Sequence, residues 1–273
     1  MKILIASDME GITGVVHWDQ VSPDHPEYPR FRRLMTGDIN AAVRGALDAG
    51  ADEIIVTDGH NNGRNILIEE LDSRARLNSG SSAPLNMVQG IDSGVDGVFF
   101  IGYHARIGTQ NAILEHTWSD ERVANLRINS QPYGEIGLNA GVCGHFGVPV
   151  LMISGDQSAC TEAVDLLGNV ETAVVKQATG RMTAELLPPQ VAQTKIQQAA
   201  YEALLRLKDG TAPQPLRVST PVIMTLDLVH SEMADRAARL PGVRRQGRTI
   251  EYTAPDMLIL YSAFITTLAL ARK

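Results

Sequence analysis

The amino-acid sequence predicts an α/β protein in which a largely parallel sheet carries helices on both faces, followed by a smaller α+β C-terminal domain. Short runs of apolar residues recur along the chain, and amphipathic stretches of helical length separate several of them. These runs are apolar throughout rather than alternating, which is typical of strands buried on both faces. The composition agrees, because 44% of the 273 residues are hydrophobic and only 5% are aromatic, enough for a large aliphatic core.

The first part of the chain supplies the parallel sheet. The expected strands are residues 2–6, 53–57, 97–102, 148–154 and 172–176. The expected helices are residues 37–49, 136–146 and 159–167. Because strands and helices alternate, each helix can cross one face of the sheet and bring the next strand in parallel.

A break at Leu187, Pro188 and Pro189 ends this first part, so we place a catalytic domain at residues 1–188 and a smaller domain at residues 189–273. The expected elements of the second domain are a helix at 189–208, a strand at 221–228, a helix at 230–240, a strand at 243–253 and a helix at 256–271. This domain holds no cluster of metal-binding residue types, which favours a role in packing or oligomerisation.

Charge and hydropathy limit the partners and the location. A formal charge of -7 argues against a nucleic-acid partner, because neutralising phosphates requires clustered lysines and arginines. The apolar run at residues 3–6 is too short for a signal peptide, and the apolar stretch at 257–270 falls short of the ~20 residues of a spanning helix. We therefore expect a cytoplasmic protein without a membrane anchor.

The two cysteines, Cys143 and Cys160, are too few for a disulfide framework and are expected to be reduced. Cys160 is an alternative candidate for a nucleophile. Its place inside a predicted helix favours a buried and inert thiol instead.

Polar residues follow four of the predicted strands, and in open parallel sheets the carboxyl ends of strands border the ligand site. Asp8 and Glu10 follow the first strand two residues apart, so on an extended backbone both carboxylates face the same side. Two like charges held together need a cation between them. The pair alone is equally compatible with an ordinary polar loop.

His60 and His104 follow the second and third predicted strands in glycine-containing turns. A single loop histidine is more often hydrogen-bonded or exposed than a metal ligand. Together with Asp8 and Glu10 at the same sheet edge, however, they provide two imidazoles and two carboxylates, a mixture that zinc accepts readily.

Three further residues are candidates for the site. Glu135 lies in the predicted first turn of a helix, where an acidic residue can also simply complement the helix dipole. Asn139 comes one turn later on the same helical face and is a candidate for substrate binding. His116 follows an apolar pair and is either functional or a hydrogen-bonded core histidine.

Five motifs in register raise the specificity of these assignments. They are Asp8-Met9-Glu10-Gly11 after Ser7, Asp58-Gly59-His60, Gly102-Tyr103-His104, Glu115-His116-Thr117 and Gly134-Glu135. In this order and at these separations they resemble the D-aminopeptidase family of metallopeptidases, over nearly the whole chain.

This resemblance implies a site and an assembly. It implies two zinc ions per chain, held by the residues at the family's ligand positions, with the first of them bridging: Asp8, Glu10, His60, His104 and Glu135. It also implies that His116 is the catalytic histidine and that the chain forms a homodecamer of two stacked five-membered rings. The implied substrates are short peptides that begin with D-alanine.

A two-metal site can provide a bridging hydroxide for attack on the scissile carbonyl and can bind the free α-amine of a peptide, which are the needs of an aminopeptidase. His116 would then transfer a proton or stabilise the tetrahedral oxyanion, and a covalent role is also open. Two alternatives remain: a two-metal phosphoesterase, and a non-catalytic peptide-binding protein linked to dipeptide uptake.

Overall fold

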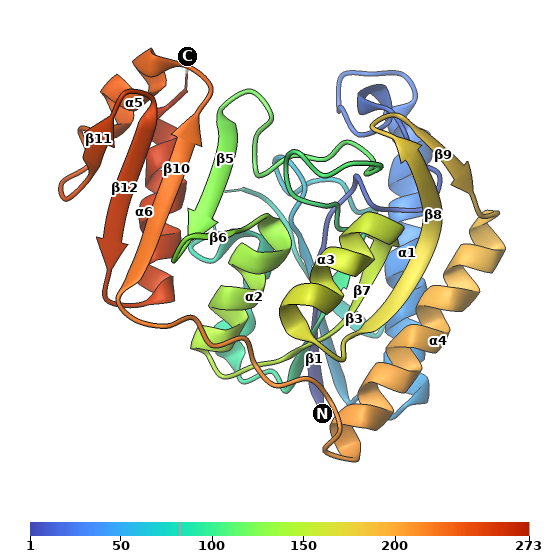
Figure 1. The fold of residues 1–273 in the computed structure, drawn as a ribbon. Coiled ribbons are helices and arrows are strands. Elements are labelled where there is room, and N and C mark those ends of the chain that lie inside the picture. The colour runs from blue at the N-terminus through green and yellow to red at the C-terminus, as the bar shows by residue number, and fades with distance from the viewer. Residues whose placement is uncertain (82, 273) are drawn as a thin grey trace.

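The computed structural model describes residues 1–81 and 83–272 (Figure 1). A seven-stranded sheet forms its centre, and its strands are parallel except at one edge, where β9 runs antiparallel to β8. In spatial order the strands are β3 (Ala75–Asn78), β2 (Glu53–Asp58), β1 (Lys2–Ser7), β4 (Gly97–Ile101), β7 (Val150–Asp156), β8 (Glu171–Gly180) and β9 (Thr183–Leu186). The predicted fold class is confirmed.

Helices cover both faces of this sheet (Figure 1). On one side lie α1 (Tyr28–Asp48) and α4 (Pro189–Lys208), and on the other α2 (Glu135–His145) and α3 (Gln157–Leu167). Successive residues of β1 alternate between the two cores: Ile3 and Ile5 belong to the cluster with α1 and α4, and Leu4 to the cluster with α2 and α3. The uninterrupted apolar strands follow from this two-sided burial.

A second sheet has five antiparallel strands and is drawn at the left of Figure 1. Its spatial order is β11 (Arg244–Gln246), β12 (Thr249–Ala254), β10 (Val222–Leu228), β5 (Val123–Ile128) and β6 (Gln131–Pro132). α5 (Ser231–Ala237) and α6 (Met257–Leu270) pack on β10 and β12, and α6 also contacts α2.

The domain boundary at residue 188 stays a prediction, and the observed packing crosses it in both directions. α4 follows the boundary in sequence but packs against α1 and β8 of the parallel sheet. β5 and β6 precede the boundary but belong to the antiparallel sheet, which β5 joins by pairing with β10.

Several elements differ in extent from the sequence-based expectation. α1 begins at Tyr28 rather than at residue 37, since Pro29 is favourable in a first helical turn. The strand expected at 243–253 is the hairpin β11–β12, which turns at Gly247 with a φ of 60°. The sequence did not predict four of the strands, β3, β5, β6 and β9. Single turns of 3-10 helix lie in the loops at Trp18–Gln20, Asn86–Val88 and Ile91–Ser93.

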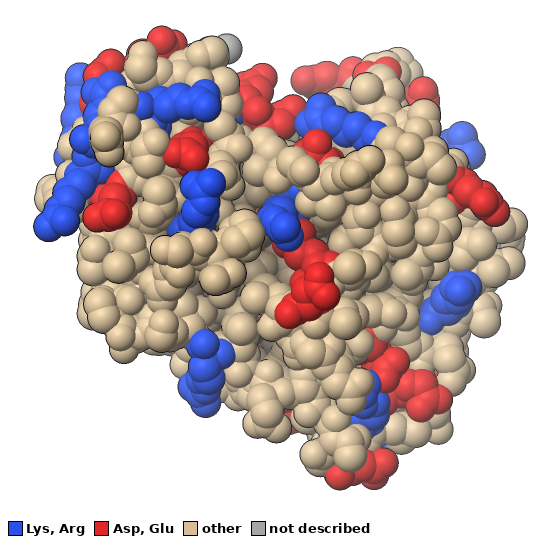
Figure 2. Space-filling model, in the orientation of Figure 1, with Lys and Arg blue, Asp and Glu red and all other residues tan. Residues whose placement is uncertain are grey.

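Within residues 1–81 and 83–272, no helix combines the length and the hydropathy required to cross a membrane. On the face drawn in Figure 2, acidic and basic side chains are interspersed, and the densest group of lysines and arginines lies over β11 and β12.

Candidate metal centre

The candidate site lies at the carboxyl ends of the central strands. β1 is flanked by β2 and β4, so the turns that follow these three strands meet at one edge of the sheet. They carry Asp8, His60 and His104, and Glu135 is the first residue of α2. The structure brings these four side chains together with Glu10, as the sequence predicts.

Gly11 joins the turn after β1 to the turn after β4. Its N–H donates to the carbonyl of Gly102 at 2.8 Å, and a Cβ atom here would lie 1.9 Å from the Tyr103 carbonyl oxygen. Only glycine permits so close a backbone approach. The glycine after Glu10 therefore fixes the acidic turn against the loop that carries His104.

Asp8 occupies the middle of the cluster. Its Oδ1 lies 3.3 Å from His60 Nδ1, and its Oδ2 lies 3.4 Å from His104 Nε2. Glu10 Oε2 is 3.1 Å from the same nitrogen of His60, and Glu135 Oε1 is 3.1 Å from the same nitrogen of His104. Asp8 therefore contacts both histidines, and each histidine also contacts one glutamate.

Backbone carbonyls orient both imidazoles. His60 Nε2 lies 2.9 Å from the carbonyl oxygen of Val21, and His104 Nδ1 lies 2.9 Å from that of Ala105. Because a carbonyl can only accept, these nitrogens carry the hydrogen. His60 Nδ1 and His104 Nε2 then face the carboxylates, which is the orientation of a metal-ligating histidine with its other nitrogen bound to a carbonyl.

A divalent cation fits this arrangement. Among the described residues, Asp8 Oδ2, Glu10 Oε2 and His104 Nε2 are buried side-chain atoms with no hydrogen-bond partner. Buried polar atoms are rarely left in this state, and burying several carboxylates together costs several kcal/mol per ion unless a cation compensates them. Carboxylate oxygens and imidazole nitrogens are a donor set that suits zinc.

The pKa values of these residues reflect the close approach of their buried charged groups. Burial, with the neighbouring Glu10 carboxylate, raises the pKa of Asp8 to about 7. Burial lowers the pKa of a histidine, but at His60 and His104 the adjacent carboxylates outweigh burial and raise the pKa well above its usual value. In the metal-free protein, protons therefore provide the positive charge that the carboxylates require.

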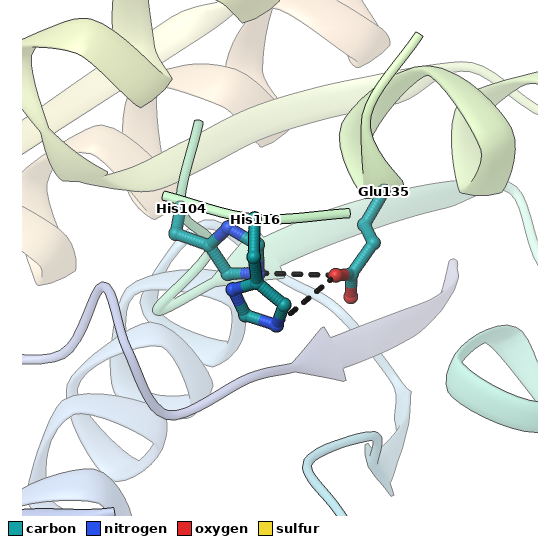
Figure 3. A group of neighbouring side chains, drawn as sticks. All are labelled: His104, His116 and Glu135. Atoms are coloured by element: carbon teal, nitrogen blue, oxygen red, sulfur yellow. Dashed lines mark ion pairs between the residues drawn. The ribbon is translucent and has the colours of Figure 1, made fainter. Parts of the chain in front are cut away.

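His116 lies beside this cluster in a different environment. Its ring stacks on that of His104, with centroids 4.0 Å apart and an interplanar angle of 11° (Figure 3). His116 Nδ1 lies 2.9 Å from the Leu114 carbonyl, and Nε2 lies 3.6 Å from Glu135 Oε1. Burial and the positive charge of His104 lower the pKa of His116. The result is a neutral imidazole with the lone pair of Nε2 toward the site.

His116 is also close enough to act as a ligand. Ligand atoms of His104, His116 and Glu135 lie within 4.8 Å of one another, as do those of Asp8, Glu10 and His104. In Figure 3 both imidazoles approach the same oxygen of Glu135. Zinc per chain, measured in a variant that lacks the His116 imidazole, therefore distinguishes a catalytic role from a ligating one.

The cluster lies in a cleft of about 890 Å³. Two tryptophans line it: the Trp18 ring meets the His116 ring edge to face at 5.5 Å, and the Trp118 backbone N–H donates to Glu135 Oε1 at 2.7 Å. The sequence analysis did not predict that these tryptophans line the cleft, although Trp118 directly follows the Glu115-His116-Thr117 motif. Further lining comes from the loop at 58–63 and from α6.

Asn139 is not brought into the cleft. It is fully buried, and its amide donates to the Tyr103 hydroxyl at 3.0 Å and to Met87 Sδ at 3.2 Å. The Tyr261 hydroxyl donates to its oxygen at 3.3 Å. This placement behind the site supports the packing of α2, and Asn139 does not line the cleft. Its role in substrate binding stays a prediction.

Two aspartates that were not predicted as site residues support the loops. Asp58 accepts the N–H groups of Asn65 and Ile66, and the Asn65 amide donates to the His60 carbonyl at 2.6 Å. Asp156 accepts the N–H of Ile113 at 2.6 Å, shortly before His116. For Asp156 a polar residue at a strand end was the only sequence signal, whereas Asp58 also belongs to the Asp58-Gly59-His60 motif.

Both cysteines are buried and free, as expected. Burial raises the pKa of Cys160 to about 12 and raises that of Cys143 still further. Neither thiol is a nucleophile at neutral pH, because the thiolate is the reactive form.

Comparison with known proteins gives one consistent result. The family model described as D-aminopeptidase matches residues 1–266. A D-aminopeptidase of Bacillus subtilis (strain 168) is 34% identical over 275 residues, covering 100% of this chain and 98% of that protein. The solved structure of the Zn-dependent D-aminopeptidase DppA from Bacillus subtilis, described as a self-compartmentalizing protease, superposes with a TM-score of 0.95 at 34% identity, covering 99% of this chain and 98% of that one. The chain therefore belongs to the D-aminopeptidase family and is a peptidase, as its motifs predicted.

Proposed function

We propose that this peptidase is a zinc-dependent aminopeptidase that releases N-terminal residues, D-alanine in particular, from short peptides. The observation that supports this most directly is the position of Asp8 between two histidine–glutamate pairs at the base of a cleft. The family membership and the Zn-dependent relative support the choice of metal.

Two ions would be held on either side of Asp8. Glu10 and His60 would complete one site, and His104 and Glu135 the other. When bound, zinc supplies Lewis acidity at the scissile carbonyl and lowers the pKa of water. Five protein ligands for two ions leave coordination positions open, as catalytic sites require.

The residues of the chain position the substrate and move protons. Asp120 and Glu121 line the cleft and are not among the proposed ligands, so their carboxylates can pair with the α-ammonium group of a peptide. His116 Nε2 lies 3.6 Å from Glu135 Oε1 and carries a lone pair, so it can accept a proton from the attacking water and return it to the leaving amine. The hydrogen bond from Nδ1 to Leu114 fixes the ring for both steps.

The decisive test is incubation of the zinc-loaded protein with D-Ala-D-Ala, L-Ala-L-Ala and N-acetyl-D-Ala-D-Ala. We expect free alanine from the first, much less from the second and none from the third, because acetylation removes the α-amine. Equal cleavage of the acetylated peptide would contradict an aminopeptidase. Retention of intact peptide by a zinc-loaded protein would indicate the peptide-binding alternative.

A phosphoesterase uses the same kinds of ligand, so p-nitrophenyl phosphate is the matched control substrate. Besides the proposed ligands, the cleft is lined by acidic side chains (Asp58, Asp120, Glu121) and by basic ones (Arg122, Arg272), so its charge alone does not decide between the two substrates. Phosphate release at a rate comparable with alanine release would therefore overturn the proposed assignment.

We also propose a homo-oligomer, by similarity a decamer, in the cytoplasm. Support comes from the relative described as self-compartmentalizing. α6 provides little independent support, because Leu260, Phe264 and Leu268 are already buried within the chain. Light scattering at micromolar concentration should give a mass near ten chains, and a monomer mass would contradict the assembly.

A further inference from the structure

Lys176 of β8 is the largest charged side chain in the interior, with 1% of its surface exposed. Its ammonium group donates to three carbonyl oxygens, those of Glu10 at 2.6 Å, Ile12 at 2.9 Å and Val15 at 2.8 Å. An ammonium group has three donors. All of them are therefore directed at a single segment, the loop at residues 10–15.

No carboxylate within residues 1–81 and 83–272 forms an ion pair with Lys176. The nearby acidic groups are engaged elsewhere: Asp38 of α1 accepts the N–H and hydroxyl of Thr13, and Asp156 of β7 accepts the N–H groups of Ile113 and Ala159. Backbone dipoles of the loop thus compensate the buried charge. An apolar residue of similar volume would fill this space but would leave the three buried carbonyls without this donor, so the lysine serves the loop and not packing alone.

The loop held by Lys176 begins with Glu10 and has no regular secondary structure. Asp8, two residues earlier, is fixed independently, because its N–H donates to the Ile101 carbonyl at 2.8 Å. His104 and Glu135 belong to the loop after β4 and to α2. Of the proposed ligands, Glu10 is the one whose own backbone is bound by this lysine.

We propose that Lys176 is a positioning residue that holds Glu10 in its metal-binding geometry. Loss of the lysine then weakens the ion at Glu10 and His60 and largely spares the ion at His104 and Glu135. This inference rests on the two-ion centre proposed above.

The test is the zinc content of Lys176→Met, in which the side chain keeps its approximate length but has no donor. Wild type, K176M and the control K208M are dialysed against buffers of fixed free zinc, and zinc per chain is measured. Lys208 is the last residue of α4, and its ammonium group donates to the carbonyl of Ala49, which follows α1. K208M therefore also removes a lysine-to-carbonyl bond. We expect two ions in wild type and K208M, and one tight ion in K176M with the second weakened by the ~10 to 100-fold typical of outer-shell changes.

Cobalt substitution provides a spectroscopic readout that stability does not affect. The visible bands of one ion should change in K176M while those of the other persist. Lys176→Gln, which retains two donors, should fall between wild type and K176M; if K176M does not fold, K176Q against K208Q provides the same comparison.

Wild-type zinc binding by folded K176M at both sites would show that the lysine serves only the fold, and equal weakening of both ions would show a general effect. Either result overturns the proposal. Fewer than two ions in wild type would contradict the two-ion centre itself. The proposed selective weakening of the ion at Glu10 and His60 would then fail with it.

Discussion

The three histidines of the candidate site differ in their surroundings more than in their sequence context. His60 and His104 each lie within 3.5 Å of two carboxylate groups, and both have a raised pKa. His116 lies 3.6 Å from a single carboxylate, stacks on His104 and has a lowered pKa. All three use one nitrogen to bind a backbone carbonyl.

This difference favours the proposed division of the histidines between two functions. An imidazole surrounded by carboxylates is suited to share a cation with them, whereas a neutral imidazole at the edge of the cluster is suited to proton transfer. The predictions below test whether metal binding and proton transfer separate along this division.

The largest effect is expected from Asp8→Ala. Because Asp8 lies between both histidine–glutamate pairs, its loss should abolish binding at both sites, whereas Glu10→Ala should remove only one ion. Zinc per chain after dialysis distinguishes the two variants. Equal zinc retention in both would show that Asp8 does not bridge.

His116→Ala should leave the zinc content and the fold intact while kcat on D-Ala-D-Ala falls by at least the ~10² of a positioned proton-transfer group. His104→Ala is the matched comparison, because the rings stack but only His104 lies between two carboxylates. Loss of a zinc ion in the His116 variant would make it a ligand. Full turnover would make it a packed core histidine.

As the pH rises, the stability of the metal-free protein and its affinity for zinc should change in opposite directions. In the metal-free protein the pKa values of Asp8, His60 and His104 are raised, so the folded state holds protons that the unfolded state has lost. Stability from these groups is present below their unfolded pKa values and is lost as the pH rises through the folded values. Zinc must displace the same protons, so its affinity should rise with pH.

Melting temperatures of zinc-loaded and EDTA-treated protein between pH 6 and 8 measure this contrast. We expect the metal-free value to fall and the difference between the two forms to widen as the pH increases. A difference that stays constant, or a titration of zinc without proton release at pH 7, would contradict the proposed displacement.

The smallest effect is expected from Asp58→Asn, which acts on His60 through its loop. The substituted amide would keep the volume of the side chain but weaken the bonds to the N–H groups of Asn65 and Ile66. Zinc affinity should fall about tenfold at one site, as is typical when an outer-shell partner is lost. Asp72→Asn, at an exposed turn that binds Arg74, is the control and should not change zinc binding.

The sequence predicted most of the fold and the residues that meet at the site. Fully apolar strands identified the parallel sheet, and the rule that its carboxyl ends form one edge placed Asp8, His60 and His104 together. Their convergence depends on β1 lying between β2 and β4, a strand order that the sequence alone does not fix.

What could not be predicted depends on contacts between distant segments. β5 joins the antiparallel sheet through β10, about a hundred residues later, and no local pattern specifies that pairing. Asn139 shares a helical face with Glu135, but α2 is buried almost all round, so that face meets Tyr103 and Tyr261 rather than the cleft. Lys176 ends an apolar run and would ordinarily be expected to reach solvent.

The position of the two tryptophans has a practical consequence. Trp18 and Trp118 are the only tryptophans in the sequence, and both line the cleft, one against His116 and the other bonded through its backbone to Glu135. The tryptophan emission of the protein therefore arises at the site. Occupation of the cleft should change that emission without any label, and single Trp→Phe variants would report on each wall separately.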